Sequence, residues 1–198
     1  MKKILLGLWA ISVVFSGVVC SWAQEPSAKT AVFIIAHKDF QDDEFSLPLA
    51  VLSDNGVLVA IASSSLEQAT GTNGTTTKPD MLLKDVRADN FDAVVFIGGP
   101  GAAEYLHDPL ALQLAQDSVA KGKVLGAICL APVILANSGV LKGKNATVYP
   151  TEAANLKAGG AVYSAQPVEQ DGRIITADGP KSAKAFGQAL ARELKGGL

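Results

Sequence analysis

The chain reads VLGAICLAP from residue 124 to residue 132. The first five residues form an apolar run of strand length, which is typical of a strand buried on both faces of a parallel sheet. At Cys129 this run gives way, without a spacer, to a helical pattern that starts near Leu130. The stretch therefore predicts a tight strand-to-helix turn. It places Cys129 at the edge of the sheet where ligands bind in parallel α/β folds.

The expected surroundings of Cys129 favour a reactive thiol. Backbone N–H groups at the start of the following helix, together with the helix dipole, favour a negative charge there. We therefore expect this thiol to ionise more readily than that of free cysteine, and the thiolate is the nucleophilic form. The alternative is a small, inert core residue, as many unpaired cysteines are. Position alone leaves both interpretations open.

The rest of the chain alternates between the same two patterns. We expect further buried strands at 30–36, 57–62 and 93–97, and helices at 45–52, 110–120, 130–137 and 181–194. Residues 63–78 lack a core-forming pattern and predict a loop or hairpin. Short strands follow at 161–163, 168–169 and 173–176, and Asp171-Gly172 predicts a hairpin between the last two. The alternation predicts an α/β domain with a doubly wound, mostly parallel sheet, a C-terminal hairpin and a final helix.

The N-terminal segment has the pattern of an export signal. Lys2 and Lys3 precede an apolar stretch at 4–19, and Ser21-Trp22-Ala23 supplies the small residues that a signal peptidase reads. We expect a signal peptide at 1–23, a polar leader at 24–29 and one domain at 30–198. The mature protein would be periplasmic or secreted, without stable insertion in the membrane. Cys20 offers a lipoprotein alternative, but Gly17-Val18-Val19 matches a lipid-attachment sequence poorly.

Composition argues against several classes of partner. The net charge is −2 and no basic stripe is present, so nucleic acid is not an expected partner. Two histidines, and a single cysteine once Cys20 has been removed, lack the spacing of a metal site. No phosphate-binding loop or dinucleotide fingerprint follows the first strand. We therefore expect neither a metal nor an organic cofactor.

Two further segments should lie beside Cys129. The sequence GGPG at 98–101 follows the strand at 93–97, and its glycines allow close approach of a ligand to the backbone. Because proline has no N–H, Gly99 and Leu130 are the expected donors to an oxyanion, unless the glycines merely form a tight turn. Glu44 begins a helix at the same edge of the sheet. Its carboxyl either complements the helix dipole or, beside a thiolate, stays protonated and donates to sulfur.

Family resemblance favours the second interpretation of Glu44. Motifs occur in order along the chain: FQDDE at 40–44 with Pro48 and Asn55-Gly56, FIGG at 96–99, GAICLAP at 126–132, GVLKGK at 139–144, and DGRIIT at 171–176 with Gly179-Pro180 and Phe186. Together they resemble the ThiJ/PfpI superfamily, which includes deglycases, PfpI-type proteases and glyoxalase III enzymes. The resemblance implies a flavodoxin-like three-layer sandwich and a homodimer. It also implies Cys129 as nucleophile in an elbow, Glu44 as its protonated partner, and Gly99 and Leu130 as backbone donors.

Two positions depart from this family pattern. PfpI-type members carry a histidine directly after the cysteine, where this chain has Leu130, and the deglycase-like branch has a histidine where this chain has Tyr149. A Cys-His-acid triad for peptide hydrolysis cannot be assembled from these positions. His37, Gly98, Tyr149 and Glu152 remain candidates to line the pocket, although Glu152 also suits the first turn of a helix. His107 fits a surface position at the start of a helix.

Three functions follow from these residues. The leading one is a cofactor-independent enzyme of the glyoxalase III or deglycase type, a hydro-lyase or hydrolase acting on small reactive carbonyls. The second is a redox-sensing, stress-response protein in which Cys129 is oxidised to a sulfinate. An amidase or protease of the PfpI type is the least favoured, because the histidine is absent.

Overall fold

The structure is a computed structural model, and it describes residues 28–196. The predicted signal peptide at 1–23 lies outside the described residues, as does most of the predicted leader. Among the helices of residues 28–196, none is both long enough and apolar enough to cross a membrane.

A seven-stranded sheet forms the centre of the molecule, in the order β11-β12-β8-β7-β1-β3-β6. All neighbouring strands are parallel except β11, which runs antiparallel to β12. The strands of this sheet are β1 (Thr30–Ile34), β3 (Leu58–Ser63), β6 (Met81–Leu82), β7 (Ala93–Phe96), β8 (Val124–Ile128), β11 (Val168–Asp171) and β12 (Ile174–Ala177). Two small sheets lie apart from it: β2 (Lys38–Phe40) with β4 (Ala69–Gly71) and β5 (Thr76–Thr77), and β9 (Asn145–Ala146) with β10 (Val162–Tyr163).

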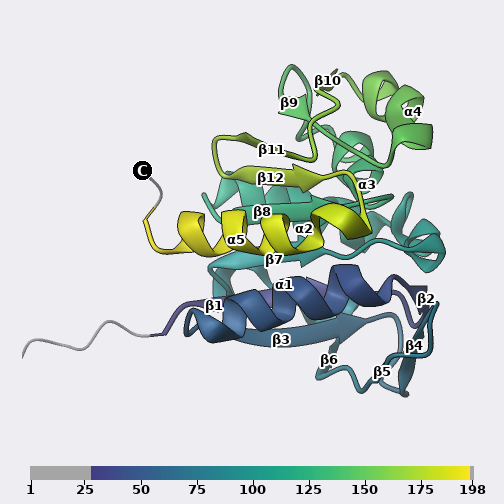
Figure 1. The fold of residues 1–198 in the computed structure, drawn as a ribbon, viewed down its shortest axis with the longest axis vertical. Helices are drawn as coiled ribbons and strands as arrows, with labels where there is room; N and C mark the ends of the chain where they lie inside the picture. The colour runs from purple at the N-terminus through teal and green to yellow at the C-terminus, as the bar shows by residue number, and fades with distance from the viewer. Residues whose placement is uncertain (1–27, 197–198) are drawn as a thin grey trace, which may run out of the picture.

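Helices cover both faces of the central sheet (Figure 1). The helices α1 (Asp42–Asp54) and α5 (Ala183–Leu194) pack side by side on one face. The other face carries α2 (Pro109–Ala120) and α3 (Pro132–Asn137), and α4 (Ala153–Ala158) packs against α3. Short 3-10 turns complete the chain: η1 (Leu83–Asp85), η2 (Ala88–Asn90), η3 (Pro100–Tyr105), η4 (Pro150–Glu152) and η5 (Pro180–Ser182). The fold is thus the three-layer α/β sandwich that the sequence predicts.

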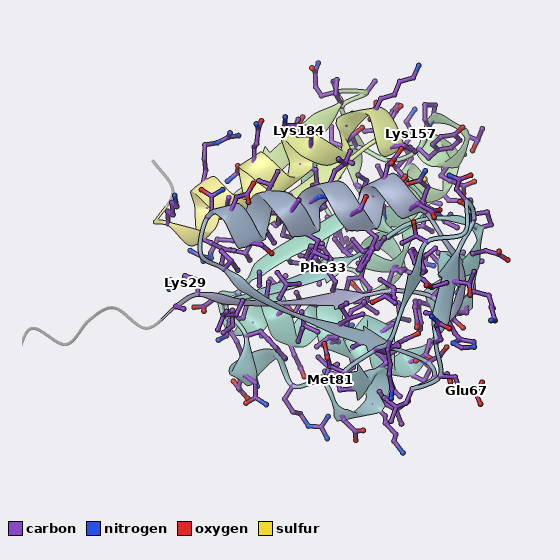
Figure 2. The ribbon with its side chains drawn as sticks, turned by 60° about the horizontal axis from the view of Figure 1, so that its bottom comes forward. Lys29, Phe33, Glu67, Met81, Lys157 and Lys184 are labelled. Carbon is purple, nitrogen blue, oxygen red and sulfur yellow. The ribbon has the colours of Figure 1, made fainter. Side chains whose placement is uncertain are left out.

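The central strand β1 shows why its residues form an unbroken apolar run. Successive side chains of a strand point to opposite faces of the sheet. Phe33 therefore packs into the core beneath α1 and α5, while Val32 and Ile34 enter the core on the opposite face. Figure 2 shows Phe33 in the interior, whereas Lys157 and Lys184 project from the periphery. A strand covered on both faces needs apolar residues at every position.

Most predicted elements are present, with some different bounds. The hairpin at Asp171-Gly172 joins β11 to β12, and the segment 63–78 forms the hairpin of β4 and β5. The helix expected from Leu130 begins two residues later, at Pro132, because proline suits the first turn of a helix. The short strands β2 and β6 and the helix α4 were not predicted as such. Segments of two to six residues are set by their neighbours in the fold more than by their own pattern.

Candidate active site

Three loops meet at the carboxyl edge of the central sheet. The loop after β1 leads to Glu44, the loop after β7 begins with Gly98, and the turn after β8 holds Cys129. The backbone N–H of Gln41 donates to the carbonyl of Gly98 at 3.0 Å, which joins the first loop to the second. The carboxyl ends of parallel strands meet at one edge, so the order of the strands brings these segments together.

Cys129 lies at the apex of a strained turn. Its φ is +64°, a left-handed conformation that side chains with a Cβ rarely adopt. Its N–H donates to the carbonyl of Ala177 at 2.9 Å, and its own carbonyl accepts from the N–H of Tyr149 at 2.9 Å. These two bonds hold the backbone on both sides of the residue. The turn is therefore the sharp strand-to-helix elbow that presents a nucleophile at the edge of a sheet.

Gly98 leaves the space in which Glu44 and Cys129 approach each other. A Cβ at position 98 would lie 2.5 Å from Glu44 Oε2, 2.7 Å from Cys129 Cβ and 2.6 Å from the carbonyl oxygen of Ile128. Each of these distances is far below van der Waals contact. A residue other than glycine at this position would therefore displace the acid or the thiol.

Gly99 is required for a different reason. Its φ is +103°, and a Cβ there would lie 2.5 Å from the backbone of Asp39 and 2.5 Å from that of Gln41. The glycine loop is therefore pressed directly against the loop that precedes Glu44. This close packing holds the Gly99 N–H beside Cys129, where it favours the thiolate.

The Glu44 carboxyl is completely buried, and neither of its oxygens has a hydrogen-bond partner of ordinary geometry. Burial raises the pKa of Glu44 to about 8, and the nearby charges of Asp43 and Asp178 add to this effect. The Cys129 thiol and the Gly98 N–H oppose the shift, but burial outweighs them. At neutral pH the carboxyl therefore carries its proton, as expected of an acid kept away from water.

Burial also raises the pKa of Cys129, to about 12, and the adjacent Glu44 carboxyl contributes to the rise when it is charged. The backbone N–H groups of Gly99 and Leu130 lower it. This contradicts the expectation of a thiol that ionises readily by itself. The effect of the Glu44 charge applies only above the pKa of that acid. When Glu44 is protonated, the charge is absent and the carboxyl can donate to sulfur, so the two groups titrate as a pair.

A cavity of about 360 Å³ opens over Cys129, whose side chain keeps partial contact with solvent. Its walls consist of Gln41, Gly99, Pro100, Cys129, Leu130, Tyr149, Glu152 and Pro180. Most of these side chains present apolar surface, which suits a small, weakly polar ligand. Among residues 28–196, no group of three or more potential ligands is arranged to hold a metal ion.

The structure brings together most of the predicted site residues. Gly99, Leu130, Tyr149 and Glu152 line the cavity with Cys129, while Glu44 and Gly98 lie directly behind the thiol. His37 is not part of the lining. Its backbone N–H donates to Glu104, and its carbonyl accepts from the N–H of Thr70. His107 is exposed and lines a separate depression between α3 and α4.

Three residues of the lining were not predicted from the sequence: Gln41, Pro100 and Pro180. Gln41 caps α1, and its side-chain oxygen accepts from the N–H of Glu44 at 2.8 Å. A polar residue three positions before an acid, at the start of a helix, is a capping signal that could have identified it. The two prolines carry no such signal, because proline is common in loops of every kind.

Asp42 fixes the loop beside the site. Its carboxylate accepts from the N–H of Asn73 and the N–H of Thr75, each at 2.8 Å, and from the hydroxyl of Thr72 at 3.0 Å. Although burial alone would raise the pKa of Asp42, these hydrogen bonds lower it to about 2. The carboxylate thereby fastens the β4–β5 hairpin to the first turn of α1, two residues before Glu44.

Comparison with known proteins assigns the chain and its fold to one family. The family model described as "DJ-1/PfpI family" matches residues 29–193, so the chain belongs to the DJ-1/PfpI family. An uncharacterised protein of Methanocaldococcus jannaschii is 39% identical over 167 residues, which cover 83% of this chain and 82% of that protein.

Relatives with assigned activities are more distant. The glutathione-independent glyoxalase DJR-1.2 of Caenorhabditis elegans is 30% identical, over 85% of this chain and 90% of its own. The deglycase PfpI of Pyrococcus furiosus is 29% identical, over 83% of this chain and 99% of its own. Among solved structures, a ThiJ/PfpI domain protein from Brachyspira murdochii superposes with a TM-score of 0.82 at 30% identity, covering 84% of this chain and 96% of that one.

Proposed function

We propose that the protein is a cofactor-independent, cysteine-dependent enzyme that converts small reactive carbonyls to hydroxy acids, in the manner of a glyoxalase or deglycase. The main support is the pairing of a buried, protonated Glu44 with Cys129 across the space left by Gly98. Relatives at about 30% identity named as a glyoxalase and a deglycase support the same class of reaction.

The proposed reaction of methylglyoxal begins with addition. In the form of the pair that has lost one proton, the Cys129 thiolate attacks the aldehyde carbon, and the carbonyl π electrons move to oxygen, which lies against the N–H groups of Gly99 and Leu130. Glu44 gives its proton to this oxygen and becomes a carboxylate. The product of this step is a neutral hemithioacetal.

The Glu44 carboxylate then acts as a base. It removes the proton from the carbon bonded to sulfur and returns it to the neighbouring carbon, while the hydroxyl proton of the hemithioacetal passes to the neighbouring carbonyl oxygen. The hemithioacetal thereby becomes the thioester of lactate. Water hydrolyses the thioester, releasing lactate and the free thiol. The overall change is the addition of one water molecule to methylglyoxal, so no external oxidant or reductant is required.

This scheme accommodates the two departures from the family pattern. Leu130 and Tyr149 occupy the positions where family members carry histidine, so Glu44, whose carboxyl contacts the thiol, is the acid–base group that the scheme uses. One carboxyl suffices for an internal proton transfer, because the proton it takes is the one it returns. Peptide hydrolysis is disfavoured, because neither position supplies the histidine of a Cys-His-acid triad, which would activate the nucleophile and protonate the leaving amine.

Lactate formation from methylglyoxal without glutathione tests the proposal. We expect turnover by the unaltered protein, and losses of at least about 100-fold in Cys129→Ala and in Glu44→Gln, since general acid–base catalysis contributes about 10²–10⁴-fold. His37→Gln is the matched control, because His37 does not line the cavity, and it should retain activity. Absence of turnover with methylglyoxal, glyoxal and glycated substrates alike would refute the proposal.

The second candidate is a redox sensor. Oxidation of Cys129 to a sulfinate needs no general base, which agrees with the missing histidines, and Glu44 with two backbone N–H groups would hold the oxygens. Mass spectrometry after mild peroxide treatment would show a stable two-oxygen adduct on Cys129. A thiol that resists both peroxide and alkylation would exclude both candidate functions.

We also propose that the protein is exported and that it forms a homodimer. The N-terminal sequence supports export, and the family resemblance supports a homodimer. Fractionation of cells that express the full chain, followed by light scattering on the purified protein, would test both.

A further inference from the structure

Glu152 places a carboxylate in the wall of the cavity. It is the residue before α4, yet its side chain makes no hydrogen bond to the backbone N–H groups of that helix. Instead, Glu152 Oε2 accepts from the side-chain amide of Asn155 at 2.7 Å, and Oε1 lies 3.4 Å from the hydroxyl of Thr151. The side chain is therefore held by its neighbours while it lines the cavity. The capping role that a first-turn acid commonly has does not account for it.

No positive side chain offsets this carboxylate within the cavity. Of the eight residues that form the wall, none is Lys, Arg or His. The charges of Asp43 and Asp178 raise the pKa of Glu44, so these two neighbours add negative charge near the cavity. Lys181 follows Pro180 but is exposed and does not line the cavity. Lys157, five residues after Glu152, is also exposed and outside the lining, and its ammonium lies 5.5 Å from the centroid of the Tyr163 ring. The side chains that line the cavity therefore carry one formal charge, the negative charge of Glu152.

We propose that Glu152 is a specificity-determining residue, which makes the Cys129 cavity accept neutral and positively charged electrophiles and reject negatively charged ones. This deepens the proposed function and rests on it only for the identification of carbonyls as substrates. Within that class, the enzyme would act on uncharged or cationic carbonyl compounds. It would exclude those that carry a free carboxylate, such as glyoxylate, because they would lie beside an uncompensated negative charge.

A pair of thiol reagents of opposite charge tests this without any turnover. The probes are the 2-(trimethylammonium)ethyl and the 2-sulfonatoethyl esters of methanethiosulfonate. In each case the Cys129 thiolate attacks the divalent sulfur of the reagent, a disulfide forms, and methanesulfinate leaves with the bonding electron pair. The reaction is balanced without a further oxidant. The rates for each protein are divided by the rates for free cysteine, which removes the intrinsic difference between the reagents.

In the unaltered protein we expect a normalised cation-to-anion rate ratio of about ten or more at low salt, falling as ionic strength rises. Glu152→Gln should reduce this ratio severalfold, and Glu152→Lys should bring it below one. Glu67→Gln is the matched control: it removes the same charge from an exposed site at the periphery of the molecule, on the loop between β3 and β4 (Figure 2), and should leave the ratio unchanged.

A ratio near one in the unaltered protein, or an equal change in Glu152→Gln and Glu67→Gln, would overturn the proposal. Thermal unfolding of each variant shows whether it is folded under the labelling conditions. The labelling does not depend on catalysis. Charge selectivity without lactate formation would therefore refute the proposed function and support the role of Glu152. Lactate formation without charge selectivity would support the proposed function and refute the role of Glu152.

Discussion

The carboxyl of Glu44 and the thiol of Cys129 face each other across the position where Gly98 lacks a side chain. A Cβ at Gly98 would lie within 2.7 Å of an atom of each. The acid is fully buried and the thiol half-buried, so each group strongly affects the ionisation of the other. The site can therefore hold one proton between the carboxyl and the sulfur, and the proposed reaction uses this proton.

Gly98→Ala should disable the site while leaving the fold intact. The added methyl group would meet Glu44 Oε2 at 2.5 Å and the Ile128 carbonyl at 2.6 Å, so the carboxyl must move. We expect alkylation of Cys129 at pH 7 to slow by at least about tenfold, which corresponds to about 1.4 kcal/mol. Circular dichroism and thermal unfolding would verify folding, and an unchanged alkylation rate in a folded variant would contradict the described geometry.

Glu44→Gln should change how stability depends on pH. The acid releases its proton near pH 4.5 when exposed and near pH 8 in the folded protein. Between these values the folded state binds more protons than the unfolded state, so stability falls as pH rises through this window. Glutamine does not titrate and lacks this loss.

Denaturant unfolding of both proteins at pH 5 and pH 8 measures the effect. The stability of Glu44→Gln relative to the unaltered protein should increase by on the order of 3 kcal/mol over this interval. Glu67→Gln serves as the control with a surface acid. Parallel stability profiles for the unaltered protein and Glu44→Gln would show that Glu44 is not buried as a neutral acid.

Asp42→Asn should destabilise the protein at neutral pH. The pKa of Asp42 is lowered to about 2, so its stabilising effect is present above about pH 4 and disappears as pH falls through 2. We expect a loss of about 1–2 kcal/mol at pH 7, since a shift of one pKa unit corresponds to about 1.4 kcal/mol. Asp43→Asn removes the charge of the exposed neighbour and should lower the free energy of unfolding much less. Equal effects of the two substitutions would contradict the role of Asp42 in holding residues 72–75.

Cys129→Gly and Cys129→Ala should differ in stability by less than an ordinary Gly–Ala pair. At φ +64° a Cβ is strained, and glycine relieves this strain. The relief offsets the larger entropy that glycine loses on folding. Thermal unfolding of the two variants should therefore give equal midpoints, or a higher one for glycine. A clearly lower midpoint for Cys129→Gly would indicate that the turn is unstrained.

The layers of the fold were predictable because strands such as β1 and β8 are covered on both faces and must be apolar throughout. Cys129 was predictable for the same reason, as it interrupts one of these runs at its end. The short strands β2 and β6 were not, since they depend on partners distant in the sequence. Pro100 and Pro180 line the cavity because of how their loops pack in the fold. The sequence around each proline does not reveal this packing.

The structure contradicts the expectation that the Cys129 thiol ionises more readily than free cysteine. A position before a helix indicated a thiol that ionises readily, but α3 starts only at Pro132, and burial raises the thiol pKa. The depth of a side chain below the surface follows from the whole fold, so no pattern around residue 129 reveals it. Activation therefore depends on the proton of Glu44 more than on the helix.

The pH dependence of Cys129 alkylation by iodoacetamide tests this most directly. We predict that the rate rises through the first ionisation of the Glu44–Cys129 pair, near pH 8, because the pair that has lost one proton includes a thiolate to which Glu44 donates. In Glu44→Leu the donor is lost while burial persists, so the midpoint should rise by at least about one unit. A rate that rises only above pH 10 in the unaltered protein, or equal midpoints in both proteins, would contradict the shared proton.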